Sequence, residues 1–320
     1  MTLLRALSLI TAVALLTVAG VTQAQQKFPH KPVRIVSVGA GSQGDILTRM
    51  IAPKLSEAWG QPVVVENRAG AGGTLAANTV AKATPDGYTI LLLSSQFAIG
   101  AAMHANLPYD PVKDFAGISQ VGSGTVAVLV HPSLGVKSVK EFIALAHAKP
   151  GQIVFSSAGA GSGSHLNGEM FRHAAGIKAV HVGFKSSSEA TIEVVASRIH
   201  YGVLPLGPAL HFIKDGRVLA LAVADQRSPL APDVPALSEV VPNYERSGSY
   251  GMLAPAGTPR PVLQQISHAL RRVFEQPDVK ARLQAMGFVA APTTPEEYDK
   301  IVRGDIETFG RMVRIAGLRK

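Results

Sequence analysis

Glycine-rich turns that could bind an anion follow three of the predicted strands. The first turn spans residues 39–44, between a β-branched run at 34–38 and a helix whose apolar residues recur every three or four positions. Asp45 is placed to cap this helix. Unpaired N–H groups at a helix N-terminus and the helix dipole both attract negative charge. The stretch therefore predicts an anion site, and the rest of the chain has to identify the anion.

The same arrangement returns about 120 residues later, in the second turn, residues 156–165. It follows the predicted strand 153–155 and precedes an amphipathic helix. The third turn, residues 70–73, follows the predicted strand 62–66. A single turn of this kind is most simply structural, because glycine permits a positive φ. Three of them at strand-to-helix junctions favour anion binding, and the two similar ones indicate two lobes that face one ligand.

A dinucleotide site is one alternative for the first turn. Gly39, Gly41 and Gly44 match the pattern G-x-G-x-x-G. Glu66 ends the next predicted strand, 22 residues after Gly44, where a ribose-binding acid would lie. Such an enzyme would also need a catalytic acid or base near its cofactor, and the first half of the chain offers no evident one. The motif alone is a weak signal.

Two other chemistries have less support. Ser162 lies in a Gly-Ser-Gly-Ser run whose spacing differs from the G-x-S-x-G of a nucleophile elbow, so we expect it to satisfy backbone at a helix start. His165, Glu169 and His173 share one helical face and could bind zinc with outside ligands. His165 lies at the helix start and a fourth ligand is missing, so a core or solvated face is the better interpretation. We predict no metal and no cofactor.

The N-terminus indicates export. Residues 1–24 contain one positive residue, Arg5, an apolar run at 6–18 and small residues before position 25, as in a cleavable signal peptide. The apolar run is short for a membrane span, although an anchor that stays attached is the alternative. The chain has no cysteine, which excludes disulfides, thiolate chemistry and cysteine-ligated zinc.

Charge and length limit the partners. Without Arg5, the 30 Lys and Arg residues exceed the 22 Asp and Glu residues, and the net charge of +8 favours an anionic partner. Nucleic acid is a poor candidate, because the basic residues are scattered and aromatic residues are few. The 296 residues that follow the predicted signal peptide suffice for two domains with cores.

The predicted elements alternate between strand and helix after the signal peptide, as in an open parallel sheet. Ser95 follows the predicted strand 88–93, where ligands lie in such sheets. Pro53 is expected to kink or divide the first helix near residues 51–52. We predict that strands 126–130 and 219–223 cross between the lobes. The C-terminal part is mostly helical, with predicted caps at Thr258 and Thr294.

Several longer runs resemble the periplasmic solute receptors (Bug family) of tripartite tricarboxylate transport systems. They extend through nearly the whole chain after the signal peptide, and together they are highly specific. The runs are residues 28–36, 60–73, 85–89, 109–115, 156–165, 168–169, 181–182 and 254–259. The resemblance implies a periplasmic-binding-protein type II-like (Venus flytrap) α/β fold, with two α/β lobes joined by crossing strands. We place lobe 1 at residues 25–125 plus 225–320 and lobe 2 at 126–224.

The resemblance also implies how a ligand would be bound. In this family, backbone N–H groups and hydroxyls from turns of both lobes bind a carboxylate, often with ordered waters. Asp45 is acidic, so we expect it to cap its helix or to accept from a ligand hydroxyl, amine or water. The predicted ligand-binding residues are Gly39, Ala40, Gly41, Ser42, Gln43, Asp45, Ala71, Gly72, Ser95, Ser157, Gly161, Ser162, His165, Lys185 and Leu204.

The chain departs from the family pattern at several positions that should lie near the ligand. Ser42 replaces a usual glycine, and Ser37-Val38 replaces a usual proline-phenylalanine. Other departures are at Phe184, Ser186, His200 and Ser249. These differences bear on the identity of the ligand more than on the fold.

Together these features predict a non-enzymatic periplasmic receptor. It would capture a small organic carboxylate between two lobes and present it to a membrane permease or a sensor kinase. We expect a monomer without a nucleic-acid partner. The alternatives are an exported dinucleotide- or phosphate-binding α/β enzyme that uses residues 39–44, and an interaction protein whose cleft stays empty.

Overall fold

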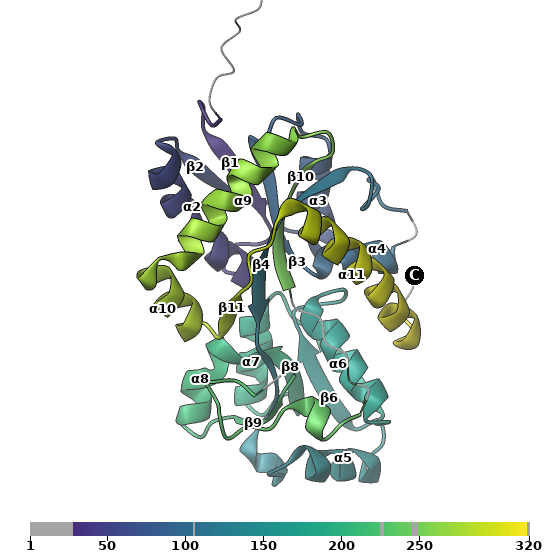
Figure 1. Cartoon of the computed structure of the whole chain (residues 1–320). Coiled ribbons are helices and arrows are strands. Elements are labelled where there is room, and N and C mark those ends of the chain that lie inside the picture. The colour runs from purple at the N-terminus through teal and green to yellow at the C-terminus, as the bar shows by residue number, and fades with distance from the viewer. Residues whose placement is uncertain (1–27, 105, 225–226, 243, 245–248, 319–320) are drawn as a thin grey trace, which may run out of the picture.

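The computed structural model describes residues 28–104, 106–224, 227–242, 244 and 249–318. The predicted signal peptide, residues 1–24, lies outside the described residues. The chain forms two α/β lobes, one above the other in Figure 1, and each lobe is built on its own sheet.

The first lobe takes its elements from both ends of the chain. Its strands are β1 (Val33–Ser37), β2 (Val63–Asn67), β3 (Thr89–Ser94), β4 (Phe115–Gly124), β10 (Ser249–Pro255) and β11 (Phe288–Ala290). Its helices are α2 (Gln43–Trp59), η1 (Ala71–Gly73), α3 (Thr74–Ala81), α4 (Gln96–Met103), α9 (Arg260–Glu275), α10 (Pro277–Ala285) and α11 (Pro295–Ile315). The strand order is β11-β4-β10-β3-β1-β2. β1 is parallel to β2 and β3, whereas β10 is antiparallel to β3 and β4.

The second lobe is continuous in sequence over its sheet. Its strands are β5 (Val126–Val130), β6 (Ile153–Ser157), β7 (Ala179–Gly183), β8 (Tyr201–Pro205) and β9 (Leu219–Val223). Its helices are η2 (Pro132–Leu134), α5 (Val139–Ala148), α6 (Gly163–Ala174), α7 (Ser187–Val195), α8 (Leu206–Lys214) and η3 (Leu237–Glu239). The strand order is β7-β6-β8-β5-β9, with β6 parallel to β7 and β8.

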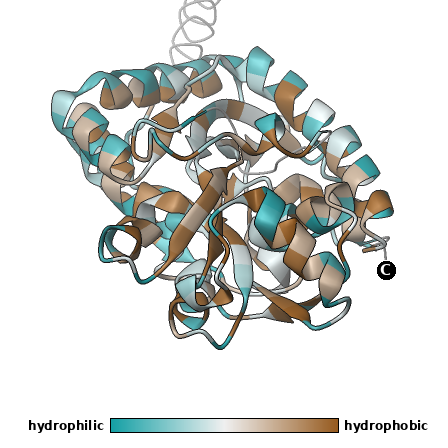
Figure 2. Cartoon of the chain, turned by 90° about the horizontal axis from the view of Figure 1, so that it is seen from below, coloured by the Kyte–Doolittle hydropathy of each residue, from teal (hydrophilic) through white to brown (hydrophobic). Residues whose placement is uncertain are grey.

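Alternating residues along each strand fill a core on each face of the sheet. In the first lobe Ile35 of β1 packs in a cluster with Leu47 of α2, whereas its neighbour Val36 packs with Ala77 of α3. In the second lobe Val128 and Leu129 of β5 divide in the same way between two clusters. Figure 2 shows the result, with hydrophobic strands inside and helices that expose hydrophilic turns.

The chain passes between the sheets at Thr125, because β4 ends at Gly124 and β5 begins at Val126. It returns between β9 and β10. The predicted crossing strands 126–130 and 219–223 both pair within the second sheet, so β5 begins directly after the crossing at Thr125 and β9 ends before the return. Leu237 and Val241 pack in the core of the second lobe, so the return follows Val241, later than the predicted boundary at 224.

A separate apolar cluster joins the two lobes. It combines residues of α4 and α11 from the first lobe with residues of α6 from the second. Its buried members are Ala98, Ile99, Met103, Leu166, Met170, Phe309, Met312 and Val313. Because α6 begins at the second turn, this cluster fixes that turn against the first lobe.

Some local expectations need correction. α2 continues through Pro53 and does not divide there. Thr258 does not cap α9, because its hydroxyl donates to the Pro255 carbonyl (2.7 Å) and the helix begins at Arg260. Thr294 caps α11 through the predicted capping box. Within the described residues no helix has the length and apolar character that crossing a bilayer requires.

Gly168 tests the packing that places α6 on the second sheet. A Cβ at this position would lie 2.4 Å from the ring of Phe155, which is fully buried. Gly168→Ala should therefore lower the free energy of unfolding by about 1–3 kcal/mol, as overpacked core positions do. Gly304→Ala in α11 is the control, because no atom lies within 4 Å of its added Cβ and alanine favours helix. Urea unfolding measures both, and a neutral Gly168→Ala would contradict the packing.

Candidate functional site

The first turn joins the carboxyl end of β1 to the start of α2. Gly41 adopts φ 76°, a left-handed conformation that reverses the chain direction at low cost for glycine. Ser42 is the helix cap: its N–H donates to the Gly39 carbonyl (3.2 Å) and its Oγ accepts from the Asp45 N–H (3.1 Å). Capping by Ser42 rather than Asp45 corrects the sequence expectation.

Asp45 closes this turn from inside. Its Oδ2 accepts from the Gly41 N–H (2.9 Å), and its Oδ1 accepts from Asn67 Nδ2 (2.8 Å) and pairs with Arg49 Nε (3.0 Å). Burial alone would raise the pKa of Asp45, but the hydrogen bonds from Gly41, Asn67 and Arg49 together hold that pKa below its usual value. A buried carboxylate with these partners holds the turn and is not presented to a ligand.

The second turn repeats this geometry in the other lobe. Residues 33–50 and 153–170 have the same secondary structure, position by position. Gly161 has φ 79°, and Ser162 caps α6 by accepting from the His165 N–H (3.1 Å). The Gly161 N–H donates to His165 Nδ1 (3.2 Å), so His165 takes the place that Asp45 has in the first turn.

A stacked pair of histidines, the buried His165 and the partly buried His181, lies beneath the second turn. The rings of His165 and His181 stack with centroids 3.9 Å apart, and His181 Nε2 is 2.6 Å from Ser157 Oγ. Burial, with a smaller effect of the nearby His181, lowers the pKa of His165 from 6.5 to about 4. Burial also lowers the pKa of His181. The second turn is therefore closed by a neutral imidazole and the first by an ionised carboxylate.

The third turn lies beside the first. The Arg68 N–H donates to the Ser37 carbonyl (2.8 Å), which continues the pairing of β1 with β2 into the turn. A Cβ on Gly39 would lie 3.6 Å from that of Ala69. Gly72 is exposed at φ 61°, and the backbone of Ala71 is in the same 3-10 turn. The structure thus brings these two predicted segments together at one edge of the first sheet.

The first and second turns, which we call the main turns, both lie where the lobes meet. Gln43 of the first turn accepts from the hydroxyl of the partly buried Tyr250 (3.3 Å), and its amide lies against Gly124, next to the crossing point at Thr125. Met103 of α4, in the first lobe, lies 3.4 Å from the position of a Cβ on Gly161. The two N-terminal helix ends, of α2 and α6, therefore flank the junction between the lobes.

Other predicted ligand residues have different roles. Leu204 is fully buried in the core of the second lobe, where it pairs with Ala127, so its side chain is not available to a ligand. Ser157 is fully buried, and its hydroxyl contacts His181 and the Gly159 backbone. Ser95 Oγ accepts from the Ser249 N–H (3.0 Å), which ties the start of α4 to β10. Lys185 is exposed at the end of β7, and its backbone N–H donates to Glu189.

The residues that a dinucleotide site, a zinc site or a serine nucleophile would use are engaged in other contacts. Glu66 forms ion pairs with Arg34 (3.0 Å) and Arg68, and the Arg68 hydrogen bond is the largest contribution to its lowered pKa. Glu169 pairs with Arg172 while His173 is exposed, and the described residues contain no cluster of three or more metal-ligating side chains. Ser162 is a helix cap, as expected.

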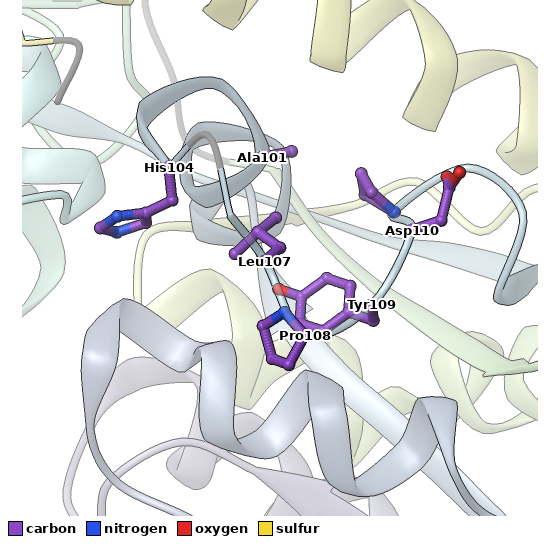
Figure 3. A pocket seen from close by; sticks show the side chains of 7 residues that line it. Ala101, His104, Leu107, Pro108, Tyr109 and Asp110 are labelled. Atoms are coloured by element: carbon purple, nitrogen blue, oxygen red, sulfur yellow. The ribbon is translucent and has the colours of Figure 1, made fainter.

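A surface hollow of about 560 Å³ lies outside these turns, at the segment that follows α4. Its lining residues are Ala101, His104, Leu107, Pro108, Tyr109, Asp110 and Pro111. In Figure 3 the His104 and Asp110 side chains lie at opposite ends of the labelled group and do not converge. The hollow includes no residue of the predicted ligand set and no helix N-terminus, so we do not take it as the ligand site.

Two residues that shape the site were not predicted as part of it. Asn67 donates to both Asp45 and the Val38 carbonyl (2.7 Å), and His181 contacts both Ser157 and His165. Both lie on strands that neighbour the turn-bearing strands, β2 beside β1 and β7 beside β6. The sequence signal that could have identified them is a polar residue on a strand predicted to lie beside a turn-bearing strand.

Comparisons with a family model and with individual relatives indicate the same family. Residues 47–318 match the model of the tripartite tricarboxylate transporter family receptor. A UPF0065 protein of Bordetella bronchiseptica is 32% identical over 98% of this chain and 93% of its own length. Protein BugT of Bordetella pertussis is 29% identical over 91% of each chain.

Solved structures of similar proteins have the same fold. An R. palustris protein solved with adipate has a TM-score of 0.84 and 26% identity, covering 91% of this chain and 98% of its own. MatC from Rhodopseudomonas palustris with bound malate has a TM-score of 0.81 and 28% identity, covering 89% of this chain and all of its own. The fold of this chain is thus that of proteins solved with small dicarboxylates.

The low pKa of His165 predicts a stability change with pH. The unfolded chain binds this proton below about 6.5 and the folded chain only below about 4, so the free energy of unfolding should fall as the pH falls from 6.5 to 4. The full effect is up to about 3 kcal/mol. Burial raises the pKa of Asp305 to about 6, which gives the opposite slope in this range. The quantity to measure is therefore the difference between wild type and His165→Asn.

Urea unfolding at pH 7 and pH 4.5 measures this difference. His165→Asn keeps an acceptor for the Gly161 N–H but cannot titrate, so it should lose less stability on acidification than wild type. His173→Asn, on the exposed face of the same helix, is the matched control and should behave as wild type. Equal acid losses in wild type and His165→Asn would contradict a buried neutral His165.

Proposed function

We propose that this chain, which belongs to the tripartite tricarboxylate transporter receptor family, binds a small organic carboxylate between its two main turns. The chain shares the solute-binding receptor role of that family. The observation that carries the ligand class is the duplicated turn: two helices, one from each lobe, start where the lobes meet with the same capped glycine geometry. Two positive helix ends suit a carboxylate.

The chemistry of binding follows from the helix starts. The first N–H groups of a helix have no partner inside that helix, and the hydroxyls of Ser42 and Ser162 each accept from the N–H of the residue three positions on. A ligand carboxylate accepts from such groups without needing a charged side chain. Closure of the lobes would exclude water and strengthen these charge-assisted hydrogen bonds. Hinge motion would occur at Thr125, where the chain passes between the two sheets.

The adipate and malate of the two solved relatives suggest the ligand's size. Both are short dicarboxylates, and we infer a ligand of similar length for this chain. The structure shows what the residues at two departures from the family pattern do. Ser42 caps α2, and Ser249 pairs with Ser95 beside the crossing. Neither removes the turn geometry, which supports a related carboxylate rather than a different ligand class.

We also infer that the chain has no catalytic activity. The acid, serine and histidine that the alternatives would use are Glu66, Ser162 and His165, and each is engaged in a structural contact. The proposed partner is a membrane permease of the tripartite type, or a sensor kinase, that recognises the closed monomer. The proposed location is the periplasm, reached through a cleavable signal peptide at residues 1–24.

Thermal unfolding with a ligand panel tests the proposal. The mature protein should be stabilised by at least one member of a panel that contains adipate, malate, citrate, succinate, benzoate and glutamate. A ligand at 100 times its dissociation constant stabilises by about 2.7 kcal/mol. NAD and inorganic phosphate are the comparison ligands. Stabilisation by NAD or phosphate, with none by any carboxylate, would support the enzyme alternative and overturn the receptor proposal for carboxylates.

Ala160 offers a test of the second turn that should not disturb folding. It is exposed at the tip of this turn, so a longer side chain can be accommodated. Ala160→Asp places a like charge beside the bound carboxylate and should weaken binding of the panel's best carboxylate at least tenfold, an effect on the scale of about 1.4 kcal/mol. Ala160→Asn has the same shape without the charge and should stay within about threefold of wild type. Equal affinities of the Asp and Asn variants, by calorimetry, would place the carboxylate elsewhere.

A further inference from the structure

We propose that Asp45 and His165 are equivalent positioning residues, each of which closes one ligand turn by accepting the N–H of its left-handed glycine. The inference rests on the proposed function, because it assumes that both turns bind the ligand. Both residues were predicted from the sequence to bind the ligand, but in this proposal neither side chain contacts it. Each acts through the backbone of its own turn.

The equivalence is visible in three matched hydrogen bonds. The cap N–H donates to the carbonyl three residues earlier at 3.2 Å in both turns, from Ser42 and from Ser162. The cap hydroxyl accepts at 3.1 Å in both turns. The glycine N–H donates to the side chain four residues later, at 2.9 Å from Gly41 and 3.2 Å from Gly161. Only the chemistry of that last acceptor differs.

Both acceptors are held in place from a neighbouring strand. Asn67 on β2 donates to Asp45 Oδ1 (2.8 Å), so the carboxylate cannot rotate away from Gly41. His181 on β7 stacks on His165 at 3.9 Å and contacts Ser157 Oγ. Asp45 and His165 are only 3% and 4% exposed. Support of this kind keeps the glycine N–H bonded inside the turn and fixes the backbone that leads into the helix.

The two acceptors respond differently to acid. His165 Nδ1 can accept from the Gly161 N–H only while it carries no proton, since a protonated Nδ1 would set two donors against each other. The charged and titratable groups that face this ring are His181 from β7, Glu169 from the same helix, with Oε1 3.9 Å from Nε2, and Arg172, which pairs with Glu169. Tyr201 of β8 packs on the Phe155 ring, which stacks on His165. The second turn should therefore lose its geometry before the first as the pH falls.

Ligand affinity with conservative and truncating variants tests the inference. Equilibrium dialysis uses radiolabelled adipate and malate as probes at pH 7.5. His165→Ala and Asp45→Ala should each weaken binding at least tenfold. His165→Asn keeps an acceptor oxygen for the Gly161 N–H and should bind within about threefold of wild type. Asp45→Asn keeps the oxygen that accepts from Gly41 but turns its NH2 group toward Asn67 and Arg49, so its affinity should lie between those of Asp45→Ala and wild type. Rescue by asparagine separates positioning from general destabilisation, and His165→Ala or Asp45→Ala binding as tightly as wild type would overturn the inference.

A pH profile of the same binding supplies the second readout. Wild type should lose affinity between pH 6 and pH 4 relative to His165→Asn, whereas Asp45→Asn should follow wild type. The same acid loss in wild type and His165→Asn would overturn the role of His165.

Amide hydrogen exchange of Gly41 and Gly161 needs no ligand. Protection that is lost in the alanine variants and kept in the asparagine variants supports the turn-closing role, even if neither adipate nor malate binds. Failure of binding alone would count against the proposed function. Unchanged exchange in the alanine variants would count against this inference.

Discussion

Backbone N–H groups at the start of a helix are the interaction on which this structure depends. Such groups have no partner within the helix, so each must be capped, solvated or given a ligand. In both lobes a strand ends, a left-handed glycine turns the chain, and a serine caps the helix. The proposed site therefore follows from helix geometry, and an ionised Asp45 and a neutral His165 hold its two turns from inside.

The two lobes stabilise the same capped glycine turn with different side chains. In the first lobe an ionised Asp45 is balanced by Arg49 and Asn67. In the second a neutral His165 is stacked on His181 and on the Phe155 ring. The second turn is also fixed against the first lobe, because Leu166 and Met170 of α6 pack with Phe309 and Met312 of α11. If the lobes separate at α6, the apolar contacts of this cluster must break, and the loss of those contacts opposes opening.

The sequence predicted the parts of this site that are local, and missed the parts that depend on packing. Glycine spacing and flanking strands located both main turns, and the family resemblance correctly identified the two-lobed fold. It could not show that Asp45 faces inward, because that depends on Asn67 on the neighbouring strand. Leu204 was assigned to the ligand, yet pairing of β8 with β5 buries it in the core. The predicted crossing strands 126–130 and 219–223 were apolar enough to cross, but hydrogen-bond pairing, which sequence does not display, keeps both in one sheet.

The most direct measurement of the central claim is a ¹⁵N-resolved NMR titration of the mature protein with the carboxylate that stabilises it best. The claim is that one carboxylate is bound by helix starts from both lobes at once. We expect the amide signals of residues 39–45 and 158–165 to shift together, with one shared dissociation constant. Shifts confined to one turn, or centred on residues 101–111 at the surface hollow, would contradict the account.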